Sequence, residues 1–201
     1  MSPKKVLILF AHPLFEKSRV HAAMVHHIPR VVGVTFHDLY EFYPDFNINI
    51  KHEQELLSQH DIIILQHPMY WYSVPPIIKQ WIDMVLEYGW AYGKGGTALQ
   101  GKWIMQALSA GGPQEAYTLE GRHQRTLRQF LAPLEQTAKL CNLTYLPPYV
   151  LHGTHRATEE QIEEHAIQYG KLITHLISGT ATLEEFAEKE YANLTPVTHG
   201  R

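Results

Sequence analysis

Residues 12–19 combine side chains and backbone that could bind a phosphate group. Ser18 is suited to begin a helix, and the first backbone N–H groups of a helix, with their partial positive charge, favour an anion. His12 and Arg19 would add donors. Neither a G-x-G-x-x-G nor a G-x-x-x-x-G-K-[ST] pattern is present, so the sequence supports neither a dinucleotide-binding loop nor a P-loop. Taken alone, the segment is explained more simply by a helix cap at Ser18 and a buried loop histidine at His12.

A second segment, residues 67–76, places Tyr70, Trp71 and Tyr72 directly after an apolar run. Neighbouring side chains at a strand end cannot all face the core, so some of these aromatic rings are expected to line a cleft. Such flat apolar walls suit a planar ring ligand. The alternative is a hydrophobic loop at a subunit interface, and both interpretations can hold together.

A third segment begins with Ser109 and Ala110 and continues into the paired glycines Gly111 and Gly112. Paired glycines permit close approach of the backbone to a ligand. Tyr117 and His123 follow, and a phenol and an imidazole can donate hydrogen bonds or protons. Taken alone, this segment is more simply a turn followed by two surface residues.

Alternating apolar runs and helical patterns indicate the elements that position these segments. Strands are predicted over 5–11, 34–39, 61–66, 102–109 and 144–151, and helices over 18–28, 51–59, 76–87, 126–141 and 159–177. This alternation predicts a parallel sheet, whose ligands bind beyond the carboxyl ends of the strands. The three segments therefore converge on one edge, and a phosphorylated planar cofactor such as flavin mononucleotide (FMN) suits them.

Prolines and the C-terminal residues modify this pattern. Pro133 is expected to split or restart the helix over 126–141, and Pro147-Pro148 to interrupt the last strand and place it at the sheet edge. A short, loosely attached helix is predicted over 184–191.

Composition excludes several classes of protein. The 201 residues suit one domain, and 45% hydrophobic with 18% charged residues is a globular balance. A net charge of -3 gives no basic footprint for nucleic acid, and the single cysteine, Cys141, excludes a disulfide framework. No targeting or membrane-spanning segment is expected, so the predicted location is cytoplasmic.

Most of the 14 histidines are given no chemical role. His21, His26 and His27 lack a clean metal-ligand spacing and are assigned to a solvated helix face. His152 and His155 are assigned to a loop near the cofactor edge, and His52-Glu53 does not begin an H-E-x-x-H motif. No metal site is expected.

Several segments together resemble a known family over residues 4–175. They are Ala11-His12-Pro13, the run from Gln66 to Pro75, Lys79-Gln80-Trp81-Ile82-Asp83, and Gly89-Trp90-Ala91-Tyr92-Gly93. The chain resembles the flavodoxin-like NAD(P)H:quinone oxidoreductases, and within them the ancillary oxidoreductase subunits of Kef-type glutathione-regulated potassium-efflux systems. The resemblance implies a three-layer α/β sandwich with a five-stranded parallel sheet in the order 2-1-3-4-5 and helices on both faces. Residues 1–179 would form this domain, and 180–201 a C-terminal tail.

The same resemblance implies a role for each matching residue. The flavin phosphate would be held by His12, Ser18, Arg19 and Val20, and the ring edge by Pro68, Met69, Tyr70, Trp71 and Tyr72. The pyrimidine side would meet Ser109, Ala110, Gly111, Gly112 and Tyr117, with Tyr117 and His123 as catalytic residues. His21 stands where the family often has Asn, which weakens one phosphate contact. FMN is favoured over FAD because the chain lacks an obvious adenine-binding extension.

The implied activity is two-electron hydride transfer from NAD(P)H through FMN to a quinone or related acceptor, by a homodimer. This is an NAD(P)H dehydrogenase (quinone) activity. The alternative is a regulatory ancillary subunit of a potassium-efflux transporter, held at the inner face of the membrane through that partner without inserting into it. A one-electron carrier of the flavodoxin type is disfavoured, because the acidic faces and Thr/Gly-rich phosphate loop of such carriers are missing from this sequence.

Overall fold

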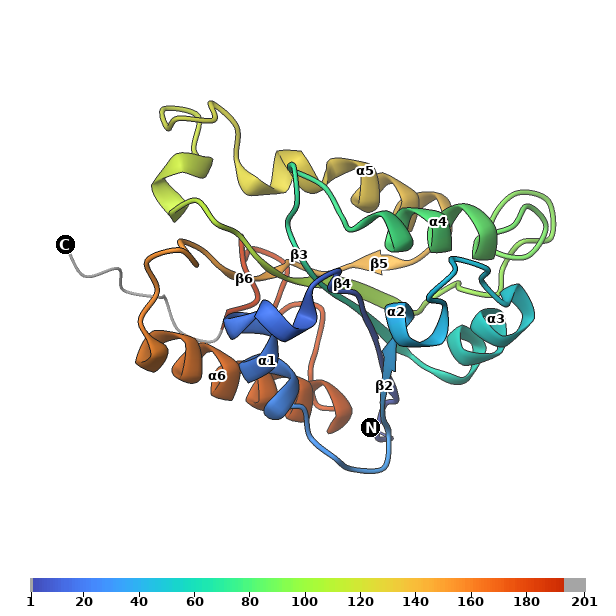
Figure 1. Cartoon of the computed structure of the whole chain (residues 1–201). Helices are drawn as coiled ribbons and strands as arrows, with labels where there is room; N and C mark the ends of the chain where they lie inside the picture. Colours follow the sequence, from blue (N-terminus) through green and yellow to red (C-terminus); the bar gives the residue numbers. More distant parts are fainter. Residues whose placement is uncertain (1, 194–201) are drawn as a thin grey trace.

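The computed structural model describes residues 2–193, which form a sheet between two helical layers (Figure 1). Its strands are all parallel and follow the order β2-β1-β3-β4-β5, with β6 also paired to β4. This confirms the predicted flavodoxin-like fold class and strand order. The strands are β1 (Val6–Phe10), β2 (Val34–Asp38), β3 (Ile62–Pro68), β4 (Trp103–Ser109), β5 (Thr144–Tyr145) and β6 (Tyr149–Leu151).

Helices cover both faces of the sheet (Figure 1). One face packs against α1 (Arg19–His26) and α6 (Glu159–Ile177). The other packs against α3 (Ile50–Gln59), α4 (Pro76–Val85) and α5 (Leu127–Leu140). Short helical turns complete the chain: η1 (Phe15–Lys17), α2 (Leu39–Phe42) and η2 (Gln114–Tyr117). No helix within residues 2–193 is both long and apolar enough to cross a lipid bilayer.

The central strands are buried on both faces, as their continuous apolar sequences predict. In β1, Val6 and Ile8 pack in the core shared with α1 and α6, whereas Leu7 and Leu9 pack in the core shared with α3 and α4. All four side chains are fully buried. Strands covered by helices on both sides need apolar residues at every position, because neither face meets water.

Pro147 and Pro148 divide the last strand into β5 and β6, and both pieces lie beside β4. Tyr145 pairs with Ile104, but Tyr149 pairs with Ala107, so the outer strand carries one extra residue across the prolines. Proline has no N–H for the ladder, and a bulge at an edge accommodates it. The predicted interruption and edge position are confirmed.

The predicted break of the fourth long helix is wrong. Helix α5 runs from Leu127 to Leu140 without interruption, and Pro133 lies inside it. Proline there removes one helical hydrogen bond. The helix persists because a reciprocal capping box joins Thr126 to Gln129, and because its apolar side packs on the domain. Residues Leu127, Leu131 and Ala138 are buried on that side.

The short, loosely attached helix predicted over 184–191 is also wrong. Residues 184–188 form turns, and the segment packs firmly on the domain. Ala181, Phe186 and Ala192 are buried in the same core as α6. An isolated helix this short does not offset its nucleation cost, whereas separate apolar anchors can hold an irregular segment. The last part of the predicted tail, residues 194–201, lies outside the described residues.

Candidate functional site

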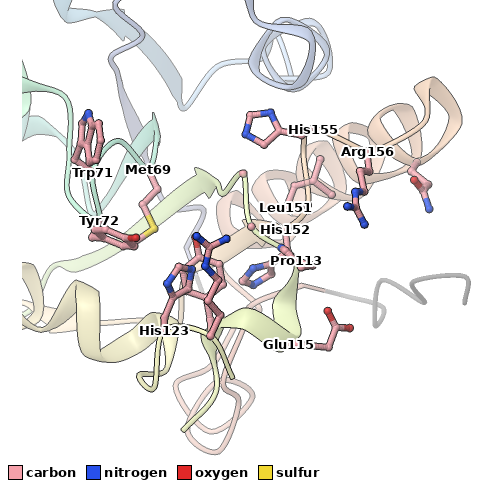
Figure 2. Close-up of a pocket in the computed structure, with 17 residues that line it drawn as sticks. Met69, Trp71, Tyr72, Pro113, Glu115, His123, Leu151, His152, His155 and Arg156 are labelled. Atoms are coloured by element: carbon pink, nitrogen blue, oxygen red, sulfur yellow. The ribbon is translucent and has the colours of Figure 1, made fainter. Parts of the chain in front are cut away.

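The carboxyl ends of β3, β4 and β6 open into a pocket of about 920 Å³ (Figure 2). Its walls come from the loops after these three strands and from the start of α6. The predicted site residues that line it are Met69, Trp71, Tyr72, Gly111, Gly112, Tyr117 and His123. Sequence reasoning missed Pro113, Glu115, Arg122, Leu151, Gly153, Arg156, Ala157 and Gln161, and placed His152 and His155 only near the cofactor edge.

The aromatic wall of the pocket, Tyr70 to Tyr72, is a β-hairpin with a two-residue turn. Tyr70 and Ser73 exchange backbone hydrogen bonds of 3.1 and 2.9 Å, so Trp71 and Tyr72 form the turn. Their φ angles are +49° and +63°, a left-handed conformation that costs large side chains free energy. The turn explains why three consecutive aromatic residues need not face the core. Trp71 is 92% exposed at the rim, and Figure 2 shows it beside Met69 and Tyr72.

A buried polar chain supports this wall from beneath. His67 has one ring nitrogen, Nδ1, 3.0 Å from the carbonyl of Pro68, and the other, Nε2, 3.0 Å from the side-chain amide of Gln106. Burial lowers the pKa of His67, so the imidazole is neutral and donates through only one nitrogen. The oxygen of the Gln106 amide faces His67, and its nitrogen donates to the hydroxyl of Tyr145, 2.6 Å away.

The glycine loop brings backbone close to two pocket side chains. A Cβ on Gly111 would lie 2.6 Å from Nε2 of His155, and one on Gly112 would lie 3.1 Å from the ring of Tyr117. Within residues 2–193, Gly111 N–H has no protein acceptor, whereas Gly112 N–H donates to the hydroxyl oxygen of Tyr117. The loop is fixed from the other side, because Gly153 N–H donates to the carbonyl of Gly112 at 2.8 Å. The N–H of Gly111 is thus held ready for a ligand.

Tyr117 and His123 lie together at the pocket wall. Their ring centres are 4.7 Å apart, and the ring of Tyr72 is 5.3 Å from that of His123. Burial raises the pKa of Tyr117, so its hydroxyl keeps its proton at neutral pH and can donate a hydrogen bond. The structure thus brings the two predicted catalytic side chains and one aromatic residue of the hairpin to one place.

The predicted phosphate loop lies beside the pocket. Ser18 caps α1, and its hydroxyl accepts from the N–H of His21 at 3.1 Å. The guanidinium of Arg19 turns away to pair with Glu159 and to donate to the carbonyl of Ala157 at 3.0 Å. This leaves the first-turn N–H groups, rather than the Arg19 side chain, as the donors here. Eight predicted residues do not line the pocket: His12, Ser18, Arg19, Val20, Pro68, Tyr70, Ser109 and Ala110.

His21 does not lie on a solvated helix face, as the sequence suggested. It is fully buried, and its Nε2 lies 3.0 Å from the hydroxyl of Ser109. Burial, followed by the neighbouring His12, holds the pKa of His21 well below its ordinary value. His26 is exposed, whereas the half-buried His27 pairs with Glu163 at 2.7 Å.

The charge of the pocket favours an anionic ligand. Arg122 and Arg156 line it, and within the described residues neither forms an ion pair. Glu115 is the one carboxylate among the lining residues. Arg122 directly precedes His123 in the sequence, so the prediction of His123 could have led to it. Arg156 follows the last strand, and its position becomes evident only because Leu151 pairs with Ser109 across the sheet.

A second polar cluster lies away from the pocket. Ligand atoms of His37, His52 and Glu53 lie within 4.8 Å of one another. The buried carboxylate of Glu53 accepts from His37 at 2.8 Å, from the Tyr43 hydroxyl at 2.6 Å and from the Trp81 indole at 2.7 Å. Three hydrogen bonds satisfy the carboxylate of Glu53, which is why it can be buried. The same bonds connect α3 to β2 and α4.

Comparisons with known proteins agree with this architecture. A family model of the flavodoxin-like fold matches residues 4–173. The glutathione-regulated potassium-efflux system ancillary protein KefG of Serratia proteamaculans is 41% identical over 168 residues, covering 84% of this chain and 92% of that protein.

Two solved structures are similar over most of their length. One is general stress protein 14 of Treponema denticola in complex with FMN, with 39% identity, a TM-score of 0.81, and coverage of 86% of this chain and 99% of that one. The other is an NADPH-quinone reductase of P. pentosaceus, with 30% identity, a TM-score of 0.75, and coverage of 83% and 96%. The chain belongs to the flavodoxin-like fold family.

Proposed function

We propose that this protein is an FMN-dependent NAD(P)H:quinone oxidoreductase. The observation that carries the proposal is the convergence of an aromatic wall, the unengaged N–H of Gly111 and the Tyr117–His123 pair on one pocket. The names of two similar proteins support it, one an NADPH-quinone reductase and the other a protein crystallised with FMN.

The residues of the site fit FMN in three respects. The pocket is large enough for a ring system and has a flat aromatic wall at Tyr72. Gly111 and Gly112 leave space that a Cβ would fill, and the N–H of Gly111 can donate to a polar ring atom. The beginning of α1, capped by Ser18, offers first-turn N–H groups to a phosphate.

Bound FMN would supply the hydride chemistry, accepting two electrons from NAD(P)H and passing them to a quinone. The protein would supply hydrogen-bond donors and a proton donor around the bound flavin. The N–H of Gly111 and the protonated hydroxyl of Tyr117, which accepts from Gly112 N–H, provide fixed donors to an oxygen that gains negative charge. His123, beside Tyr117, can give a proton to the oxygen of the acceptor. Tyr72 narrows the pocket and excludes water.

Steady-state reduction of quinones with NADH and NADPH tests the proposal, on protein whose flavin has been extracted and identified. The Tyr117→Phe, His123→Ala double variant should keep its FMN and lose about 100-fold in turnover, because donors and proton transfer are removed without opening the flavin wall. Tyr88→Phe is the matched control, since Tyr88 is exposed and lies outside the pocket. Full turnover by the double variant would contradict the assigned roles.

We also propose a homodimer that uses the aromatic rim. Tyr70, Trp71 and Tyr72 are each at least 40% exposed beside the pocket, and contiguous exposed aromatic groups mark interaction sites. Size-exclusion chromatography with light scattering gives the mass in solution. Replacing Trp71 by Asp should shift a dimer toward monomer, and a wild-type protein that is monomeric at micromolar concentration would overturn this assignment.

A second candidate role is that of an ancillary subunit of a potassium-efflux transporter at the inner face of the membrane. The name of the Serratia relative favours it. It predicts that the protein co-purifies with membranes that contain a Kef-type transporter, and does not with membranes that lack it. Equal recovery from both membranes would remove this role and leave the reductase proposal unchanged.

A further inference from the structure

A C-terminal strap, residues 180–193, runs from the end of α6 back to β6 at the edge of the sheet (Figure 1). Ala192 N–H donates to the carbonyl of Pro148 at 2.9 Å. The side-chain amide of Asn193 then engages both backbone groups of Val150, accepting from its N–H and donating to its carbonyl at 3.0 Å each. The strap thus satisfies backbone groups of an edge strand much as another strand would.

The path of the strap is fixed before it reaches β6. Phe186 and Ala192 are buried in the core that α6 shares with the sheet. The imidazole of His175, on α6, lies 2.7 Å from the carboxylate of Glu185 on the strap. Two apolar anchors and one polar contact therefore hold the strap, so its last residues meet the sheet at a defined place.

Tyr191 brings the strap to the back of the pocket wall. Its ring packs against the small apolar cluster that contains Leu108, Val150 and Tyr117. The ring centres of Tyr191 and His152 are 5.4 Å apart with an interplanar angle of 80°, and those of His152 and Tyr117 are also 5.4 Å apart. His152 and Tyr117 line the pocket, whereas Tyr191 stands behind them and does not. An effect of Tyr191 on a ligand is therefore indirect and passes through side chains that line the pocket.

We infer that the strap is a positioning element of the site, in which Tyr191 holds the rings of His152 and Tyr117 against the pocket and Asn193 fixes the strap to β6. The match to the family model ends at residue 173, so both residues lie beyond the matched range. The kinetic part of this inference rests on the proposed reductase function, whereas the structural part does not.

Hydrogen exchange of individual amides tests the structural part on the full-length protein. Gly153 and Thr154 donate to the carbonyls of Gly112 and Ala110, so their exchange reports how firmly the loop after β6 is held. Tyr191→Ala should speed exchange at these two amides at least tenfold while the amides of β1 keep wild-type rates. Tyr191→Phe keeps the ring and should restore slow exchange.

Two results would overturn the structural part. One is wild-type exchange at Gly153 and Thr154 in Tyr191→Ala. The other is equal acceleration at every amide, which means that Tyr191 only stabilises the fold. Glu188→Gln is the matched control, since Glu188 is exposed on the same strap and should leave exchange unchanged.

Quinone kinetics test the consequence for the site. Tyr191→Ala should keep its FMN and lose at least fivefold in kcat/KM for the quinone, and Tyr191→Phe should recover most of this loss. Unchanged kcat/KM in Tyr191→Ala would overturn the positioning role. If the wild-type protein itself reduces no quinone, the proposed function fails, and the exchange experiment still decides whether the strap holds the pocket wall.

Discussion

His21 Nε2 lies 3.0 Å from Ser109 Oγ, and this contact joins the first turn of α1 to the last residue of β4. One end of it belongs to the predicted phosphate side of the site, and the other leads into the glycine loop. Helix α1 follows β1, whereas the glycine loop follows β4. A side-chain contact between them therefore fixes the distance between the two halves of the site. His21 is fully buried, which makes the contact sensitive to the loss of either partner.

Ser109→Ala should lower the free energy of unfolding by about 1–3 kcal/mol. The other ring nitrogen of His21, Nδ1, has no partner within the described residues, so this change leaves the buried imidazole without its hydrogen bond. Urea unfolding at pH 8 measures the effect. Ser58→Ala is the control, because the exposed Ser58 hydroxyl bonds only to its own helix. Equal stability of the two variants would mean that the contact contributes nothing.

The stability of the protein should fall as the pH drops below about 6.5, the ordinary pKa of histidine. Burial lowers the pKa of His165 to about 3 and that of His21 well below its ordinary value. These groups stay neutral in the folded protein but take up protons once unfolded. Their contribution is therefore fully present above pH 6.5 and is lost as the pH falls toward their lowered pKa values.

His165→Gln isolates one of these groups. Between pH 6.5 and 5.5 each such histidine costs about 1 kcal/mol of stability, so the variant should lose about 1 kcal/mol less than the wild type over this interval. Urea unfolding at both pH values gives the difference. The exposed His26, replaced by Gln, is the control and should keep the wild-type pH dependence. An unchanged slope in His165→Gln would show that His165 does not resist protonation in the folded protein.

The sheet and the ends of its central strands could be predicted because they depend on local patterns. Continuous apolar residues in β1 and β3 indicate strands buried on both faces, and polar or aromatic residues just after such strands fall at one edge by topology alone. The aromatic segment containing Trp71 and Tyr72 and the glycine pair were placed at the site in this way, whereas the hairpin turn itself was not predicted. Ser18 as a helix cap followed from its residue type and position.

The rest depends on contacts between residues distant in sequence. Arg156 lines the pocket only because β6 pairs with β4, and His21 is buried only because the end of β4 lies against α1. Tyr191 lies 39 residues after His152, and its packing follows from how the strap crosses α6. At Pro133 the local rule that proline ends a helix fails. Packing and capping of α5 stabilise the helix by more than the one lost hydrogen bond costs.

At a protein concentration low enough to dissociate the proposed dimer, Trp71→Gly should raise the free energy of unfolding by about 0.5–1 kcal/mol. Trp71 has a φ of +49° that glycine adopts without strain, and its side chain is 92% exposed, so little burial is lost. Trp71→Ala is the matched control: it removes the same ring but keeps the strain, and should give no gain. Both variants should bind quinone more weakly. Equal losses of stability in both at this concentration would show that replacing Trp71 by glycine relieves no backbone strain.

Gly111→Ala tests whether a cofactor needs the space beside the Gly111 backbone, which the side chain of His155 also approaches. The new Cβ would lie 2.6 Å from Nε2 of His155, an exposed side chain that can move aside, so stability should change by less than about 1 kcal/mol. FMN affinity should fall about tenfold or more, because the backbone can no longer approach the ring.

The double variant Gly111→Ala, His155→Ala decides between two causes of that weaker binding. His155→Ala alone is the reference, since it removes the imidazole that the new methyl group would displace. If Gly111 itself must lie against the cofactor, the double variant binds FMN about tenfold more weakly than this reference, as measured by quenching of flavin fluorescence. Equal affinity of the two would show that displaced His155, and not lost backbone approach, blocks the site, and would remove Gly111 from the cofactor-binding residues.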